Sequence, residues 1–240
     1  MSAALGWGAL AASSLVIGAF LGLVRPWSDR LIGLILAFGA GGLISAVSFD
    51  LAQEGAAVGD TGFLGLGLAV GAATYLALDR IVGRRSSGSA RDGEAAENAG
   101  TSLAIGAFLD GIPEQMVLGI GIAAGEGVSA GLLVAIFVSN LPEAIGSSTE
   151  MRVAGTRSAA IRRLWVVVAL ICTAATVAGY AIADNVSGNV TAVVDGIAAG
   201  ALLVMLVDSM IPDAVRKGGD ISGLVTVLGF AVAAALSGLS

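Results

Sequence analysis

LDGIPE at residues 109–114 and VSNLPE at residues 138–143 place the same Pro-Glu pair inside two long apolar segments, 29 residues apart. Each segment, 100–123 and 127–149, supplies the roughly 20 residues that a membrane-spanning helix needs. Proline inside a helix removes a backbone hydrogen bond and kinks the helix. A carboxylate in a membrane helix is energetically expensive and marks a functional site by default. The two stretches therefore predict kinked membrane helices that carry a polar site.

The rest of the chain indicates a polytopic membrane protein. Of its 240 residues, 56% are hydrophobic, 36 are glycine and only 12% are charged, which argues against a soluble domain. The charged and turn-forming stretches separate eight segments of spanning length, and we expect an all-α fold with eight transmembrane helices. These predicted spans are 4–24, 31–53, 61–82, 100–123, 127–149, 163–183, 189–211 and 221–239.

One polar stretch, 83–99, divides the predicted spans into three and five. It is rich in Gly, Ser and charged residues, a composition typical of a flexible linker. We therefore expect spans 1–3 in residues 1–82, a cytoplasmic linker at 83–99, and spans 4–8 in residues 100–240, all within one integral membrane domain. The first segment is interpreted as a span, because no basic residue precedes it as in a signal peptide.

Charge predicts the orientation of the chain. With eight spans, all 12 Lys and Arg residues fall on one side of the membrane, which the positive-inside rule assigns to the cytoplasm. Both termini are then outside, and a plasma or bacterial inner membrane is expected. Only acidic residues lie near the outer side, which suits either a cation entrance or simple solvation. They are Glu54, Asp60, Glu126 and Asp184.

Two weak repeats suggest an inverted architecture. The Pro-Glu pairs of the fourth and fifth predicted spans lie in helices of opposite direction. Gly42 and Asp50 in the second span correspond to Gly200 and Asp208 in the seventh, at an offset of 158 residues. Inverted repeats are common in transporters, with the substrate site at their junction. The pattern predicts a 3+2+3 arrangement, in which a central hairpin lies between two inversely related triplets.

Four polar side chains are the candidate metal ligands. Asp110 and Glu114 are four residues apart and share one helix face, and Asn140 and Glu143 are three residues apart and do the same. The predicted spans around them supply no Lys or Arg as counter-ion. Carboxylate and amide oxygens together favour a hard divalent cation. The alternative interpretation is that the acids are protonated and only link helix to helix.

The prolines add backbone oxygens to this site. Pro113 and Pro142 cannot donate to the carbonyl groups of Leu109 and Val138, so each helix kink leaves a carbonyl oxygen available as a ligand. Such backbone is tolerated at membrane depth only where protein or a water-filled cavity receives it.

Three further residues are candidates for a pathway or gate: Asp50, Ser139 and Asp208. For the two aspartates, solvation of a helix end is the competing interpretation. Gly67 and Gly71 form a Gly-x-x-x-Gly pair, which predicts either a helix-packing face or a homodimer face.

Missing residue types exclude several function classes. The chain has no histidine, which excludes catalytic triads and histidine metal motifs, and Cys172 alone cannot form an internal disulfide. The acidic excess offers no basic surface for nucleic acid. We expect a protein that is not an enzyme.

At residues 110–115 and 139–144 the sequence resembles the ZIP (Zrt/Irt-like) family of divalent-metal transporters. That family has eight spans, outer termini, a variable cytoplasmic loop after span 3, and His-Asn-x-Pro-Glu-Gly in span 4. Pro113 and Glu114 match this motif, but Asp110 stands at the first histidine. In span 5, Pro142 and Glu143 match, and Ser139 stands where the family has histidine.

The resemblance implies transport of a metal ion toward the cytoplasm, by motion of spans 1, 4, 5 and 6 against the rest. We predict a mononuclear site at Asp110, Glu114 and Glu143 with Asn140 in support, because span 6 lacks the acid that completes a second metal position in the family. Carboxylates in place of imidazole favour Mn²⁺ or Fe²⁺, although Zn²⁺ also accepts them. The metal ion would be the substrate, and no permanently bound cofactor is expected.

Three alternatives remain at this point. The carboxylates could exchange protons for another cation, or the chain could be a transport-dead relative kept as a binding or regulatory protein. An intramembrane aspartyl protease that uses Asp110 and Asp208 is disfavoured, because neither aspartate follows the Gly-x-Gly signature.

Overall fold

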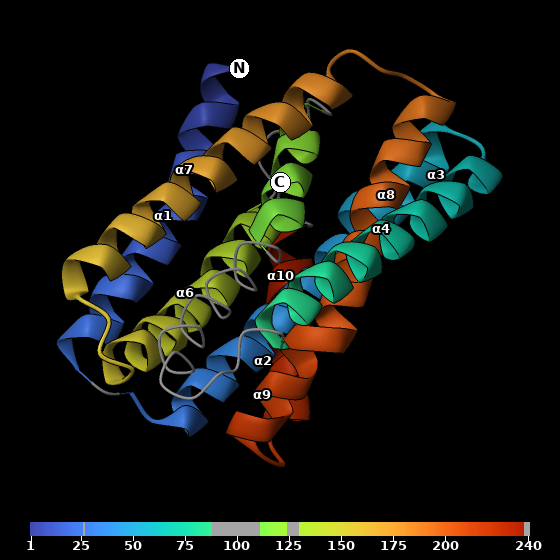
Figure 1. Ribbon diagram of the computed structural model, residues 1–240. Helices are drawn as coiled ribbons and strands as arrows, with labels where there is room; N and C mark the ends of the chain where they lie inside the picture. Colours follow the sequence, from blue (N-terminus) through green and yellow to red (C-terminus); the bar gives the residue numbers. More distant parts are fainter. Residues whose placement is uncertain (26, 88–110, 124–129, 238–240) are drawn as a thin grey trace.

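The computed structural model describes residues 1–25, 27–87, 111–123 and 130–237, and these residues form helices joined by short turns (Figure 1). The all-helical prediction is confirmed for them. Residues 111–123 are helical. The other elements are α1 (Ser2–Val24), α2 (Asp29–Ala46), η1 (Val47–Gln53), α3 (Glu54–Val58), α4 (Thr61–Ser87), α6 (Ala130–Val153), α7 (Ser158–Ala183), α8 (Asn189–Met205), η2 (Leu206–Met210), α9 (Ile211–Gly218) and α10 (Ser222–Ser237).

Six helices among the described residues are long and apolar enough to cross a membrane. Two of them are composite, since α2, η1 and α3 run on as Asp29–Val58, and α8, η2 and α9 run on as Asn189–Gly218. The shorter apolar helix α10 coincides with the eighth predicted span, and the segment 111–123 is the described part of the fourth. Six to eight spans are therefore supported, and the 3+2+3 arrangement and the sides of the termini stay predictions.

The predicted linker begins inside a helix. The helix α4 continues past position 83 and ends at Ser87, so residues 83–87 belong to its last turns. The remainder of the linker, 88–99, lies outside the described residues.

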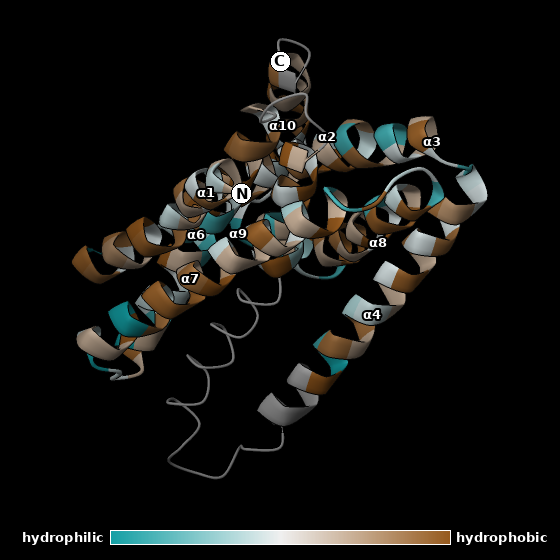
Figure 2. Ribbon diagram, turned by 90° about the horizontal axis from the view of Figure 1, so that it is seen from above, coloured by the Kyte–Doolittle hydropathy of each residue, from teal (hydrophilic) through white to brown (hydrophobic). Residues whose placement is uncertain are grey.

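Large apolar side chains cover the outside of the bundle. Leu170 on α7, Leu224 and Val227 on α10, and Val207 in η2 are all exposed by more than half of their surface. Figure 2 shows that hydrophobic residues also predominate along α1 and α7. Such extensive exposed apolar surface is unfavourable in water and fits contact with lipid.

The helices pack in two groups. The α6 unit consists of α1, the segment 111–123, α6 and α7, and the α8 unit consists of α3, α4 and α8. α2 packs against α6 on one side and against α9 and α10 on the other. Gly67 and Gly71 of α4 face the backbone of α8 so closely that a Cβ at either would overlap a carbonyl oxygen of that helix. The Gly-x-x-x-Gly pair is therefore a packing face within the chain.

The two composite helices contain π-helical turns at matching positions. Asp50 lies in η1 and Asp208 lies in η2, so both acids of the 158-residue repeat occupy the same kind of widened turn. π-Helical turns often occur at functional sites. The sequence pattern contained the repeat but gave no sign of this irregularity.

Candidate functional site

A buried carboxylate and a serine hydroxyl join the two helices that carry the Pro-Glu pairs. Glu114, on the segment 111–123, is 1% exposed. The Ser139 hydroxyl of α6 donates to its carboxylate, at 3.2 Å from Oε1 and 3.3 Å from Oε2, and also lies 3.0 Å from the Ile136 carbonyl oxygen. The structure thus brings together two residues that the sequence singled out separately.

The two predicted metal ligands of α6, Asn140 and Glu143, follow Ser139 within the next four residues. Asn140 is fully buried, and neither its carbonyl oxygen nor its amide nitrogen has a hydrogen-bond partner among the described residues. Buried amides are nearly always hydrogen-bonded, so a buried amide without a partner is a candidate for binding an ion or a water molecule. Glu143 is half-buried on the same helix, and Pro142 lies inside the helix as predicted.

Helix α7, the sixth predicted span, borders the site. The Thr176 hydroxyl donates to Gln115 Oε1 at 2.6 Å, directly beside Glu114. Cys172, one turn earlier on α7, is buried, and its Sγ lies 3.0 Å from the place of a Cβ on Gly111, three residues before Glu114. The family resemblance implied that the sixth span lies beside the site, but it did not single out Cys172 or Thr176, which lie four residues apart in an apolar helix.

Close backbone contacts hold the segment 111–123 against α7. A Cβ on Gly119 would overlap the Thr176 carbonyl oxygen, and a Cβ on Gly179 would overlap that of Met116. On the other side of α6, Gly39 of α2 lies against Ser139, where a Cβ would come within 2.9 Å of the serine Cα. These contacts fix the backbone that carries Glu114 against α7 and the backbone that carries Ser139 against α2.

Asp110, the remaining predicted ligand, lies outside the described residues. Within the described ranges no group of three His, Cys, Asp or Glu side chains converges closely enough to hold a metal ion. The described part of the site is therefore Glu114, Ser139, Asn140 and Glu143, and the complete ligand set stays a prediction.

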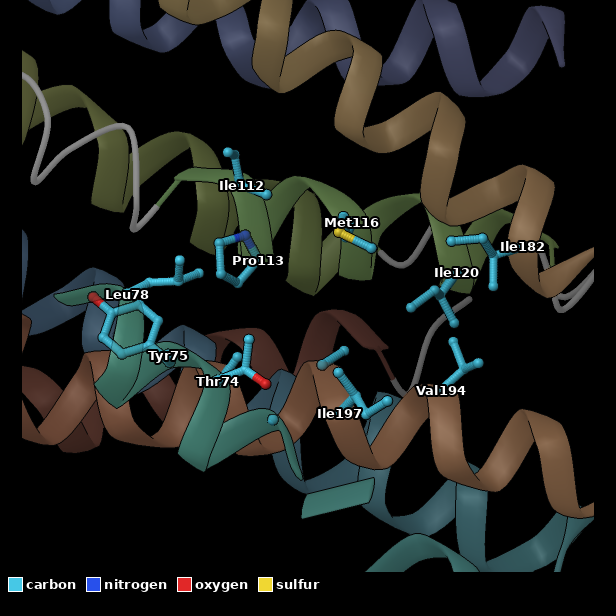
Figure 3. Close-up of a pocket in the computed structure, with 13 residues that line it drawn as sticks. Thr74, Tyr75, Leu78, Ile112, Pro113, Met116, Ile120, Ile182, Val194 and Ile197 are labelled. Carbon is cyan, nitrogen blue, oxygen red and sulfur yellow. The ribbon is translucent and has the colours of Figure 1, made fainter. Parts of the chain in front are cut away.

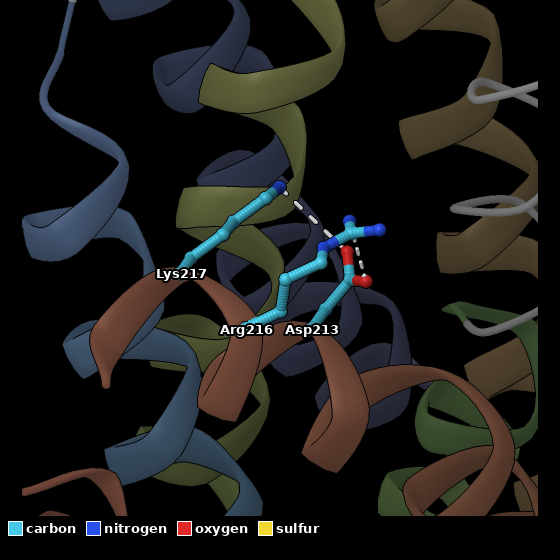
Figure 4. A network of polar contacts seen from close by, with 3 residues as sticks. All are labelled: Asp213, Arg216 and Lys217. Carbon is cyan, nitrogen blue, oxygen red and sulfur yellow. Dashed lines mark hydrogen bonds and ion pairs between the residues drawn. The ribbon is translucent and has the colours of Figure 1, made fainter. Parts of the chain in front are cut away.

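The pathway candidates lie on other helices. Asp50 is half-buried in η1, and Asp208 is exposed in η2. At the end of the same composite helix, the Asp213 carboxylate forms ion pairs with Arg216 at 2.8 Å and with Lys217 at 3.6 Å (Figure 4). The Lys217 ammonium group points from α9 toward α6, 3.9 Å from the place of a Cβ on Gly146.

The opposite face of the segment 111–123 borders an apolar cavity of about 310 Å³ (Figure 3). Pro113 and Met116 line one side of it, and Tyr75 of α4 and Ile197 of α8 line the other. The segment therefore presents a carboxylate to α6 and apolar groups to the α8 unit. This cavity lies between part of the segment and the helices α4 and α8, in contrast with the close backbone contacts between the segment and α7.

Comparison with known proteins gives one informative similarity. The chain is 29% identical over 202 residues to a candidate zinc transporter of Arabidopsis thaliana. The aligned region is 82% of this chain but 32% of that relative, so the chain spans about a third of the relative's length. No family model matches the chain. Together with the apolar helices, the similarity supports a membrane protein related to zinc transporters.

Proposed function

We propose that this protein is a divalent-metal transporter of the ZIP type, which moves Zn²⁺, Mn²⁺ or Fe²⁺ toward the cytoplasm. The observation that carries the proposal is the buried Glu114 carboxylate, which accepts a hydrogen bond from Ser139 beside the unpartnered Asn140 amide. The similarity to a candidate zinc transporter supports the same class of substrate.

In this proposal the substrate ion binds to oxygen atoms of two helices. Glu114 and Asp110 contribute carboxylates from the fourth span, and Glu143 and the Asn140 carbonyl oxygen contribute from α6. The Ser139 hydroxyl orients the Glu114 carboxylate, as outer partners of metal ligands commonly do. Because this donor set is rich in hard oxygen, it favours Mn²⁺ or Fe²⁺ while still accepting Zn²⁺.

The ion would cross the membrane when the α6 unit moves relative to the α8 unit. The α6 unit carries the ligands on tightly packed helices, and the apolar cavity lies between its segment 111–123 and the helices α4 and α8. A unit with internal glycine contacts and a looser boundary can move as a body against its neighbour. We propose that this motion alternately exposes the ion to the two sides of the membrane.

Uptake of radioactive Mn²⁺, Fe²⁺ and Zn²⁺ into proteoliposomes tests the proposal. Glu114→Gln and Glu143→Gln remove one ligand charge each with little change in shape, and both are expected to reduce uptake to the level of empty vesicles. Glu150→Gln is the matched control, because Glu150 is an exposed acid on the same helix as Glu143. Unchanged uptake in both ligand variants would show that the site is wrongly assigned.

The same vesicles separate the alternatives. Proton flux without competition by Mn²⁺ or Zn²⁺ would indicate a carrier for another cation. Metal binding by the purified protein without any flux would indicate a binding or regulatory relative.

A further inference from the structure

A second buried carboxylate lies in the α8 unit, away from the predicted metal ligands. Asp195 is 2% exposed on the second turn of α8, and neither of its oxygens has a hydrogen-bond partner among the described residues. An added Cβ on Gly55 of α3 would lie 3.2 Å from the Asp195 Cβ and 3.4 Å from Oδ2. The same Cβ would lie 2.9 Å from Leu64 of α4. The carboxyl group is therefore enclosed by a glycine backbone and apolar side chains.

The charged groups around Asp195 are all acidic. Glu54, the residue before Gly55 on α3, acts electrostatically on the Asp195 carboxyl group. Asp50 lies one helical turn before Glu54 on η1, and α8 has no other acidic or basic side chain. At the start of α4, Asp60 accepts a hydrogen bond from the Gly62 N–H at 2.7 Å, and the next titratable group on that helix is Tyr75. Residues 31–79 and 164–215 contain no Lys or Arg, and the first basic residue of α4, Arg80, comes 16 residues after Leu64.

Burial of an ionised carboxylate without donors costs several kcal/mol, whereas the protonated acid is far less expensive. The like charge of Glu54 adds to the cost of ionising Asp195, and a proton on Asp195 relieves this repulsion. A metal ion would need further ligands, and the described residues supply no third acidic, Cys or His side chain there. The cation that fits this enclosure is a proton.

We propose that Asp195 is a proton-binding site at the contact of α3 with α8, in which the Asp195 carboxyl group carries the proton and the nearby Glu54 carboxylate favours its retention. When the site loses its proton to water, both groups are ionised and repel each other. Opening of the contact between α3 and α8 then exposes them to solvent. A link between this step and metal movement rests on the proposed function, but proton binding itself does not.

Infrared spectroscopy of the purified full-length protein over a range of pH tests the site directly. The band of a protonated carboxylic acid is expected in the unaltered protein and is expected to be lost in Asp195→Asn. Asp184→Asn, which changes an exposed acid at the end of α7, is the matched control and should leave the band in place. A band that persists unchanged in Asp195→Asn would overturn the proposal.

Glu54→Gln provides a second test that keeps Asp195. Because the substitution removes a like charge, Asp195 should release its proton more easily and the band should disappear at a lower pH. No shift would overturn the part that Glu54 plays in holding the proton on Asp195. Binding of Mn²⁺ to the same variants, measured by calorimetry, should stay unchanged. Loss of the band with Mn²⁺ binding intact supports the proton site, whereas failure of the unaltered protein to bind Mn²⁺ would count against the metal site alone.

Discussion

Glu114 and Asp195 are both almost fully buried, yet their surroundings differ completely. Glu114 accepts a hydrogen bond from Ser139 and neighbours the polar side chains of Gln115 and Asn140. Asp195 has no hydrogen-bond donor among the described residues and lies against Gly55 and apolar groups. Equal burial therefore gives two different chemical settings, and we propose a metal ion as the partner of Glu114 and a proton as the partner of Asp195.

The comparison shows why burial alone does not identify a metal site. Hydroxyl and amide groups can hold a carboxylate in one orientation and complete the shell of an ion, which the α6 unit offers around Glu114. The α8 unit instead uses glycine to bring helices into backbone contact, which excludes water and polar partners from Asp195. The following predictions test this contrast, beginning with the largest expected effect.

Gly71→Leu should break the α8 unit. Its side chain would overlap the Ile197 carbonyl oxygen, so α4 and α8 must separate, and we expect a loss of stability of about 3 kcal/mol. Gly65→Leu on the same helix is the control, since no atom lies within 4 Å of its added Cβ. Thermal unfolding of the detergent-solubilised proteins measures both. Equal melting temperatures for the two variants would mean that the packing of α4 on α8 is not as described.

Asp195→Leu should stabilise the protein by about 1–2 kcal/mol, because leucine has a similar shape and removes a buried polar group that lacks a partner. Glu114→Met, the equivalent change in the α6 unit, should give no gain, since it removes the acceptor of the Ser139 hydrogen bond. Chemical denaturation of the reconstituted proteins measures the difference. A destabilised Asp195→Leu variant would contradict the described contrast.

Ser139→Ala should weaken binding of Mn²⁺ by about 10- to 100-fold, since loss of an outer hydrogen-bond partner leaves the Glu114 ligand less well oriented. Thr74→Ala on α4 is the control, because that hydroxyl donates only to the Val70 carbonyl of its own helix. Titration calorimetry with Mn²⁺ compares the two. Equal affinities would remove Ser139 from the site.

The smallest effect is expected at the exposed ion pairs of α9. Arg216 is 70% exposed and Asp213 is 41% exposed, so Arg216→Gln should change stability by less than about 1 kcal/mol. Lys217→Gln should have the larger effect of the two, because the lysine side chain is only 19% exposed. Thermal unfolding at low and high salt measures both. A larger loss for Arg216→Gln would mean that this end of the helix is more buried than described.

Much of the fold could be predicted from the sequence, because apolar segments long enough to span a membrane stand out clearly from the polar stretches between them. The predicted segment 189–211 and the helix α8 begin at the same residue, and 163–183 ends with α7. The start of α7 was predicted five residues late, since charged Arg162 and Arg163 suggested a loop. These arginines instead form the first exposed turns of the helix, where solvent can reach them.

The candidate site was only partly predictable. Glu114 and Ser139 could each be selected from the Pro-Glu motifs, but they are 25 residues apart, and their contact depends on how their two helices are rotated about their axes. Asp195 was missed because a single acid near the start of an apolar helix looks like a solvated helix end. Its burial results from Gly55, which is 140 residues earlier in the chain and can be paired with it only in three dimensions.

The π-helical turns η1 and η2 also bear on how this chain can change in length. Deletion of one residue from an α-helix rotates everything beyond it by about 100°, which would turn buried faces toward lipid. A π-helical turn already holds one residue more than an α-helical turn, so removal of that residue restores regular winding and leaves the rest of the helix in place. Val47–Gln53 and Leu206–Met210 are therefore the parts of the two longest helices where a single-residue deletion should be tolerated best.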